Sequence, residues 1–217
     1  MIERIIGKIT DYDGTRLYIG ADYSNDRKLI KQGITECEII LRDGRSISAS
    51  QRNKAHAIIR DIAEYNGDVP EAVKADLKFD FCIKNGIDDF SLSDCDMTVA
   101  REFISFLLDF VIRWGIPMQE SGILRTDDIG KYLYMCLEHR KCAICGREAD
   151  IHHVDRVGMG RDRTEIVHEG MKAMALCRIH HTECHDIGQD EFDKKYHVYG
   201  IQLDEWLCDK NRLRKAD

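Results

Sequence analysis

The chain has 217 residues, of which 43% are hydrophobic, and a formal net charge of −7 at pH 7. This hydrophobic content excludes disorder for most of the chain and suffices for one large domain, or for an ordinary domain with a smaller companion. The sequence has neither an apolar run of about 18 residues nor the order of a signal peptide, so we expect a cytoplasmic protein without a membrane segment. The negative charge excludes a basic surface over the whole molecule, but it allows a local basic channel for nucleic acid.

The first fifty residues have the pattern of a small antiparallel sheet. Asp-Gly pairs at 13–14 and 43–44 separate short runs in which apolar residues partly alternate with polar ones. Asp-Gly between such runs predicts β-hairpins. The expected strands are Ile2 to Ile9, Leu17 to Ile19, Cys37 to Leu41 and Ser46 to Ser48.

The spacing of apolar residues then changes to that of helices. Ser48 or Ser50 can cap a helix over about Gln51 to Tyr65, and a second helix begins at Pro70 and ends at Asn85-Gly86. A third helix, Thr98 to Trp114, has only a narrow polar stripe. We interpret it as a core helix, with a dimer interface as the alternative.

A fourth helix is expected beyond a domain boundary that follows the third. Thr126 can cap it, and it runs to Arg140 as a connector. The predicted fold class is α+β. Residues 1–118 form a domain with a small antiparallel sheet and helices, residues 119–140 form the connector, and residues 141–217 form a second module with a C-terminal helical tail.

Cysteine and histidine gather in this second module. The chain has nine cysteines, an odd number that favours thiols or metal ligands over disulfides, and four of them lie in one stretch with six of the nine histidines. Cys142 and Cys145 form one closely spaced pair, and Cys177 and His180 form another. Two such pairs predict a tetrahedral structural Zn²⁺ site. The alternatives are Cys184 as the fourth ligand in place of His180, or ordinary buried thiols.

A second group of histidines lies within the same stretch. His181 and His185 are four residues apart, so on a helix they share a face and can bind one ion. His152 and His153 are adjacent, and neighbouring residues of a strand point to opposite faces. One of this pair can therefore ligate the ion while the other faces a water molecule.

Together these residues resemble the HNH nuclease fold, the ββα-metal finger, over residues 141 to about 188. The resemblance is carried by a Cys-x2-Cys pair, a His-His pair at the end of an expected strand, and the run Leu-Cys-x2-His-His-x3-His. It implies that residues 141–217 are a zinc-stabilised nuclease module. The reaction at the metal site would be phosphodiester hydrolysis, in which a histidine takes the proton of the attacking water.

The resemblance also implies roles for single residues. His152, His181 and His185 would hold a catalytic Mg²⁺, Mn²⁺ or other divalent ion, and His153 would be the general base. The Asn of the family motif has no evident counterpart, and its role falls to His168 or to Lys172, of which we favour His168. The intervening loop contains three arginines that could contact DNA phosphates, namely Arg156, Arg161 and Arg163. The alternative is a solvated loop in which Asp155 and Asp162 offset their charge.

The N-terminal half is similar to the phage Orf-type (NinB-like) recombination mediators. The similarity rests on Ser50-Gln51-x-Asn53-Lys54 at the start of a helix, and on Met97-x-Val-x-x-Glu102-Phe103 ahead of Trp114-Gly115-Ile116. It implies a phage-encoded homodimer that binds single-stranded DNA and works with single-strand-binding and strand-exchange proteins. The candidate DNA-binding residues, for which a solvated helix face is the alternative, are Arg45, Arg52, Lys54 and Arg60.

The leading hypothesis is a phage recombination protein that binds single-stranded or branched DNA and nicks DNA with its HNH module. One alternative is a mediator without catalysis, whose zinc module is structural. Another is a restriction or toxin endonuclease in which the first half recognises a sequence.

Overall fold

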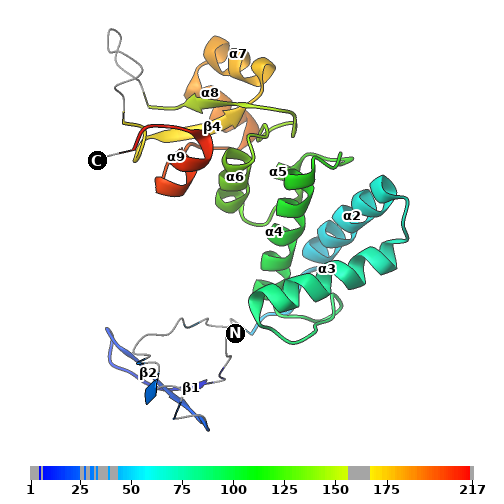
Figure 1. The fold of residues 1–217 in the computed structure, drawn as a ribbon, viewed down its shortest axis with the longest axis vertical. Helices are drawn as coiled ribbons and strands as arrows, with labels where there is room; N and C mark the ends of the chain where they lie inside the picture. The colour runs from blue at the N-terminus through cyan, green and yellow to red at the C-terminus, as the bar shows by residue number, and fades with distance from the viewer. Residues whose placement is uncertain are drawn as a thin grey trace.

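The fold of a computed structural model of the chain is shown in Figure 1. The structure describes residues 7–24, 44–155 and 167–215, together with the single positions 5, 27, 30, 31, 33 and 39. In these parts of the chain the fold is α+β, with helices and two small antiparallel sheets, as the sequence predicts.

The first sheet is a hairpin of β1 (Gly7–Tyr12) and β2 (Leu17–Ala21). Its turn lies where Asp-Gly predicts one, because the Asp13 carboxylate accepts hydrogen bonds from the backbone amides of Thr15 (2.9 Å) and Arg16 (2.8 Å). Every side chain of the two strands is exposed except the half-buried Ile19. The hairpin therefore adds nothing to the hydrophobic core seen in the described residues.

The second expected hairpin is wrong at its last strand. Ser46 forms an isolated antiparallel bridge with Asp96, and the Ile47 amide donates to the Cys95 carbonyl at 2.7 Å. Residues 46–48 thus do not form the expected strand, and among the described residues their backbone pairs with the segment before the third helix. The expected strand from Cys37 to Leu41 lies almost wholly outside the described residues.

Three helices follow close to their expected limits: α2 (Ala49–Asn66), α3 (Pro70–Asn85) and α4 (Met97–Trp114). Ser48 caps α2, since its side chain accepts from the Gln51 amide at 3.1 Å while the Gln51 side chain accepts from the Ser48 amide at 3.0 Å. Helix α4 packs against α2, α3 and α6, with most of its apolar side chains buried. The interpretation of α4 as a core helix is confirmed.

The segment expected as a connector forms the short helix α5 (Gly122–Arg125) and the helix α6 (Ile129–Glu138). The cap of α6 is Asp128, whose carboxylate accepts from the Lys131 amide at 3.0 Å, and not Thr126 as predicted. Thr126 instead accepts from the Asp128 amide. Helix α6 packs against α4 on one side and against the C-terminal elements on the other, so a single buried cluster extends from Ile47 to Cys208.

The C-terminal part consists of a three-stranded sheet and three helices, in the upper half of Figure 1. Strands β3 (Asp150–His153), β4 (Lys172–Leu176) and β5 (Ile201–Gln202) are antiparallel in the order β3-β4-β5. The helices are α7 (Arg178–Ile187), α8 (Gln189–Tyr196) and α9 (Glu205–Asn211). Among the described residues, no helix has the length and apolar character that crossing a membrane requires.

Candidate metal centres and active site

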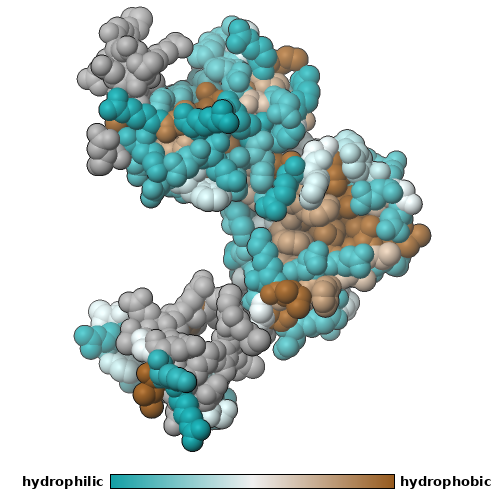
Figure 2. Space-filling view, viewed as in Figure 1, coloured by the Kyte–Doolittle hydropathy of each residue, from teal (hydrophilic) through white to brown (hydrophobic). Residues whose placement is uncertain are grey.

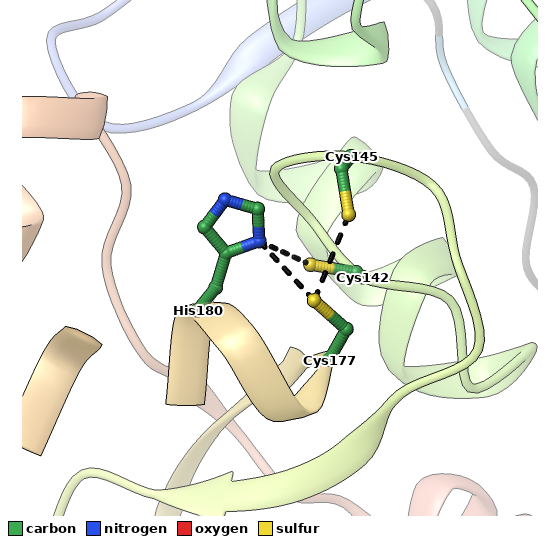
Figure 3. A group of neighbouring side chains, drawn as sticks. All are labelled: Cys142, Cys145, Cys177 and His180. Atoms are coloured by element: carbon green, nitrogen blue, oxygen red, sulfur yellow. Dashed lines mark hydrogen bonds between the residues drawn. The ribbon is translucent and has the colours of Figure 1, made fainter. Parts of the chain in front are cut away.

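The two predicted zinc pairs meet at one point (Figure 3). Cys142 and Cys145 lie in the turn before β3, Cys177 caps α7, and His180 lies in the first turn of that helix. The Nδ1 atom of His180 is 3.4 Å from the Cys142 sulfur and 3.3 Å from the Cys177 sulfur. The four donor atoms all lie within 4.8 Å of one another.

The sulfur spacing is that of a tetrahedral zinc site. A Zn–S bond of about 2.3 Å places two tetrahedral sulfurs about 3.8 Å apart, and the sulfurs of Cys145 and Cys177 are 3.7 Å apart. Gly146 allows the chain to turn tightly after Cys145, because its φ of 71° is in the left-handed region that glycine adopts most readily. The residues present therefore fit a structural zinc ion.

The surroundings of these sulfurs also suit an ion. Burial raises the pKa of the Cys142 thiol to about 12, so its thiolate form needs a compensating positive charge. Arg147 offers a positive charge to another sulfur of the group, because its Nε lies 3.3 Å from the Cys145 sulfur. Cys184 is not part of this group: its sulfur lies 3.5 Å from His152 Nε2, in the second cluster. The alternative with Cys184 as fourth ligand is wrong in this structure.

The second cluster, called here the three-histidine cluster, contains His152 of β3 with His181 and His185 of α7. Their donor atoms also lie within 4.8 Å of one another, and the ring centroids are 4.7 to 5.3 Å apart. His152 is buried at 5% exposure and His185 is exposed, so one side of the cluster is open to solvent. Burial lowers the pKa of His152 and His181, which favours the neutral imidazole that binds metal ions.

His153 lies beside this cluster in contact with His168. The Nε2 atom of His153 is 2.8 Å from the Nδ1 atom of His168. Burial, and then the neighbouring His168 and His152, lower the pKa of His153. The backbone of His168 is held by the C-terminal segment, because its amide donates to the Arg214 carbonyl at 2.9 Å. Lys172, the alternative to His168, begins β4, and its amide donates to the Asp155 carboxylate.

Two residues that no motif indicated lie against the three-histidine cluster. Gln189 places its Oε1 2.9 Å from His152 Nε2, and its own amide nitrogen is 2.7 Å from the Asp193 carboxylate. Both residues belong to α8, which follows α7 directly. Gln189 is 37 residues from His152 in the sequence, so no local spacing could reveal the contact.

The candidate DNA-binding residues are not all brought together. Arg52 donates to the carbonyls of Leu92 (3.1 Å) and Ser93 (3.0 Å), and Lys54 donates to the Thr126 carbonyl at 2.7 Å and pairs with Asp127. Arg45 accepts from the Met97 amide through its carbonyl. The three loop arginines lie outside the described residues: Arg156, Arg161 and Arg163.

Arg52 and the exposed Arg60 do share one face of α2 with His56, next to Lys74 of α3. Burial, and then the charges of Lys74, Arg60 and Arg52, lower the pKa of His56. We call these four residues the basic patch. Lys54 is not part of it, because its ammonium group is held by the segment before α6.

Comparison with known proteins decides the family. A family model described as "Putative HNHc nuclease" matches residues 20–215 of the chain. The chain belongs to this HNH nuclease family. No curated protein and no solved structure matches it.

The match extends well beyond the residues that resembled an HNH module. It begins within β2 and continues through α2 to α9, so the family includes the helical part as well as both metal clusters. The family match to a nuclease therefore covers residues 20–215 and not the C-terminal module alone. The similarity of the N-terminal half to Orf-type mediators has no counterpart in these comparisons and stays a prediction.

Proposed function

We propose that this HNH family chain is a metal-dependent DNA endonuclease that nicks DNA at the three-histidine cluster. The observation that carries the proposal is the grouping of three histidine donors, open to solvent on one side, beside the His153–His168 pair. A divalent ion such as Mg²⁺ or Mn²⁺ at His152, His181 and His185 would polarise the phosphate and stabilise the leaving oxygen. The element order β3, β4, α7 supports the proposal, because two strands followed by a helix is the order of a ββα-metal finger.

His153 is the general base in this proposal. When its Nε2–H donates to His168 Nδ1, the lone pair of its Nδ1 atom is free to take the proton of an attacking water. The water oxygen forms a new bond to phosphorus as the bond from phosphorus to the leaving oxygen breaks. His168 is a positioning residue, which takes the place of the family's Asn by holding the His153 ring.

Zn²⁺ at Cys142, Cys145, Cys177 and His180 is proposed to be structural. The donor set is closed and offers no position for substrate. Its role is to join the turn before β3 to the start of α7 and so to place His181 opposite His152. The nuclease would therefore need two kinds of ion with separate roles.

The proposed substrate is single-stranded or branched DNA, and the biological role is phage recombination in the bacterial cytoplasm. The basic patch supports contact with a polyanion, because Arg52 and Arg60 lie on one face of α2, where a phosphate backbone could meet both. Arg60 is the exposed arginine of the patch and the first candidate for a phosphate contact. The proposed protein partners, single-strand-binding and strand-exchange proteins, rest on the resemblance to Orf-type mediators alone.

A homodimer is proposed through a groove between α3 and α4. Figure 2 shows apolar surface gathered over this helical part. The groove is lined by Phe79, Ile83 and Trp114, each at least 65% exposed, and also by Phe106 and Phe110. Sedimentation at micromolar concentration should give twice the 25.1 kDa of one chain, and Ile83→Glu should give a monomer. A wild-type monomer would refute the dimer.

Cleavage assays test the function directly. Zinc-loaded protein is incubated with Mg²⁺ or Mn²⁺ and with labelled single-stranded, duplex and branched DNA. His153→Ala should lose nicking, while His197→Asn, an exposed histidine with a φ of 54° that Asn tolerates, should keep it. A wild-type protein that binds single-stranded DNA without cutting would favour the non-catalytic mediator. Sequence-specific duplex cleavage would favour the restriction-type endonuclease.

A further inference from the structure

A short chain of hydrogen bonds within the C-terminal part leads to the ring of His152. It runs from the Asp193 carboxylate to the Gln189 side chain, at 2.7 Å, and from Gln189 Oε1 to His152 Nε2, at 2.9 Å. Cys184 also contacts Gln189 Oε1 through its sulfur, at 3.4 Å. The proposed metal ligand is thus held by residues of α8 that do not belong to either cluster.

The chemistry of the three groups fixes the direction of these bonds. A carboxylate only accepts hydrogen bonds, so the Gln189 amide nitrogen must face Asp193 and its Oε1 must face His152. Because Oε1 also only accepts, the Nε2 atom of His152 must carry a hydrogen. A neutral imidazole has one N–H, and therefore the free lone pair of His152 is on Nδ1.

We propose that Gln189 is a positioning residue that holds His152 in the tautomer whose Nδ1 is free to bind the divalent ion. This inference rests on the proposed function, in which His152 is a ligand. His152 is only 5% exposed, so solvent cannot easily replace Gln189 as the partner of its N–H. Asp193 acts one step further out, because it sets which end of the Gln189 amide faces the ring.

Binding of Mn²⁺ to zinc-loaded protein, followed by electron paramagnetic resonance of the free ion, tests this role without any measurement of activity. Mn²⁺ does not displace zinc from thiolates, so the zinc site stays filled. Gln189→Leu should weaken Mn²⁺ binding by about 10-fold to 100-fold, as removal of an outer partner of a ligating histidine typically does. Gln202→Leu, at an exposed glutamine of β5, is the matched control and should bind like wild type.

A double variant separates positioning from mere packing. Gln189→Glu alone places two carboxylates against each other, whereas Gln189→Glu with Asp193→Asn restores an amide donor to a carboxylate acceptor. The double variant should therefore recover most of the Mn²⁺ affinity that the single variant loses. Proton–nitrogen correlation spectra of the histidine side chains should show His152 with its hydrogen on Nε2, and Gln189→Leu should shift that population.

One further variant, His152→Ala, tests the role of Gln189 separately from the proposed function. His152→Ala should abolish Mn²⁺ binding at the cluster. If it does, while Gln189→Leu binds like wild type or the double variant recovers nothing, the role of Gln189 is refuted and the proposed nuclease site stands. If His152→Ala binds Mn²⁺ like wild type, the ligand assignment of the proposed function is wrong.

Discussion

The two clusters of candidate metal ligands differ in the number and the kind of their donors. The zinc cluster offers four donors, with Cys142 buried and Arg147 beside the sulfurs. The three-histidine cluster offers three donors, and His185 is exposed. Four protein donors complete the coordination of a tetrahedral ion, whereas three leave one coordination position for water or substrate. The difference teaches that donor count can separate a group suited to a structural ion from one suited to a catalytic ion, even where both take ligands from the same helix.

Adjacent residues are divided between the two clusters by backbone geometry. His180 and His181 are neighbours on α7, where successive side chains point about 100° apart, so one faces the cysteines and the other faces His152. His152 and His153 are neighbours on β3 and point to opposite faces. A pair of histidines at each position could thus serve the proposed zinc ion, the proposed catalytic ion and the proposed base.

The largest effect is expected from removal of one zinc ligand. Structural zinc sites contribute an apparent binding free energy on the order of 10–16 kcal/mol to folding. Cys142→Ser should therefore lose zinc and unfold the region from β3 to α8, as measured by elemental analysis and circular dichroism. Cys184→Ser is the control, because its sulfur lies outside the zinc cluster, and it should keep one zinc per chain. Full zinc content in Cys142→Ser would contradict the division between the clusters.

The next prediction separates the ligands of the second cluster from the base beside it. His153→Ala should lower the nicking rate by about 10²-fold to 10⁴-fold and leave Mn²⁺ affinity unchanged, since a general base acts in the transition state. His181→Ala should lose the Mn²⁺ ion itself. Single-turnover nicking and Mn²⁺ titration are the two measurements. Loss of the ion in His153→Ala would mean that His153 is a ligand.

His168 should have a smaller effect than His153, because it acts through the His153 ring. His168→Ala should slow nicking on the order of 10-fold to 100-fold, less than the loss of the base itself. His168→Asn supplies the residue type of the family motif and should restore part of the rate. Equal rates in wild type and His168→Ala would show that the 2.8 Å contact does not orient the base.

Local signals predicted much of this architecture. Helix α2 follows from its Ser48 cap, and the glycines after α2, α3 and α4 adopt the left-handed conformation that ends a helix. The metal clusters follow from close spacing, because the two-residue gap between Cys142 and Cys145 and the four-residue step from His181 to His185 each bring donors together without help from distant parts.

Contacts between distant segments could not be predicted in this way. Ser46, in an expected hairpin strand, instead forms a bridge with Asp96 at the start of α4. Nothing in the sequence of 46–48 indicates this contact. Asp128 and Thr126 are both good cap residues, so residue type alone does not decide between them. Gln189 carries no motif at all, since its role depends on how α8 folds back against β3.

The basic patch offers a variant that alters DNA binding and leaves both clusters intact. Arg60→Glu with Lys74→Glu should weaken single-stranded DNA binding for all sequences alike and lower the salt slope by about one per lost phosphate contact. Arg52 is left unchanged, because it also holds the carbonyls of Leu92 and Ser93. Fluorescence anisotropy over a salt series measures the effect. If the double variant binds single-stranded DNA as tightly as wild type, the DNA-binding surface does not include α2.

The smallest effect is expected at a third group of donors, which sharpens the contrast with the two clusters. Asp109, Glu138 and His139 also lie within reach of one ion, but their atoms are already engaged. Asp109 contacts His139 Nε2 at 2.9 Å and accepts from Arg113 at 3.2 Å. We therefore expect this group to bind no ion and to act as a link between α4 and the end of α6.

The pH dependence of stability tests that link. The hydrogen bond from His139, opposed by burial and aided by Arg113, holds the pKa of Asp109 below its ordinary value. A carboxylate whose pKa is lower in the folded state stabilises the protein above its unfolded pKa of about 3.9, and this contribution disappears as the pH falls through the folded pKa. Asp109→Asn should therefore cost about 1.5–3 kcal/mol at pH 6, as for a hydrogen bond to a charged group, and progressively less below pH ~4. Denaturant unfolding at both pH values measures the difference, and a cost that does not change with pH would show that Asp109 contributes by packing and not by charge.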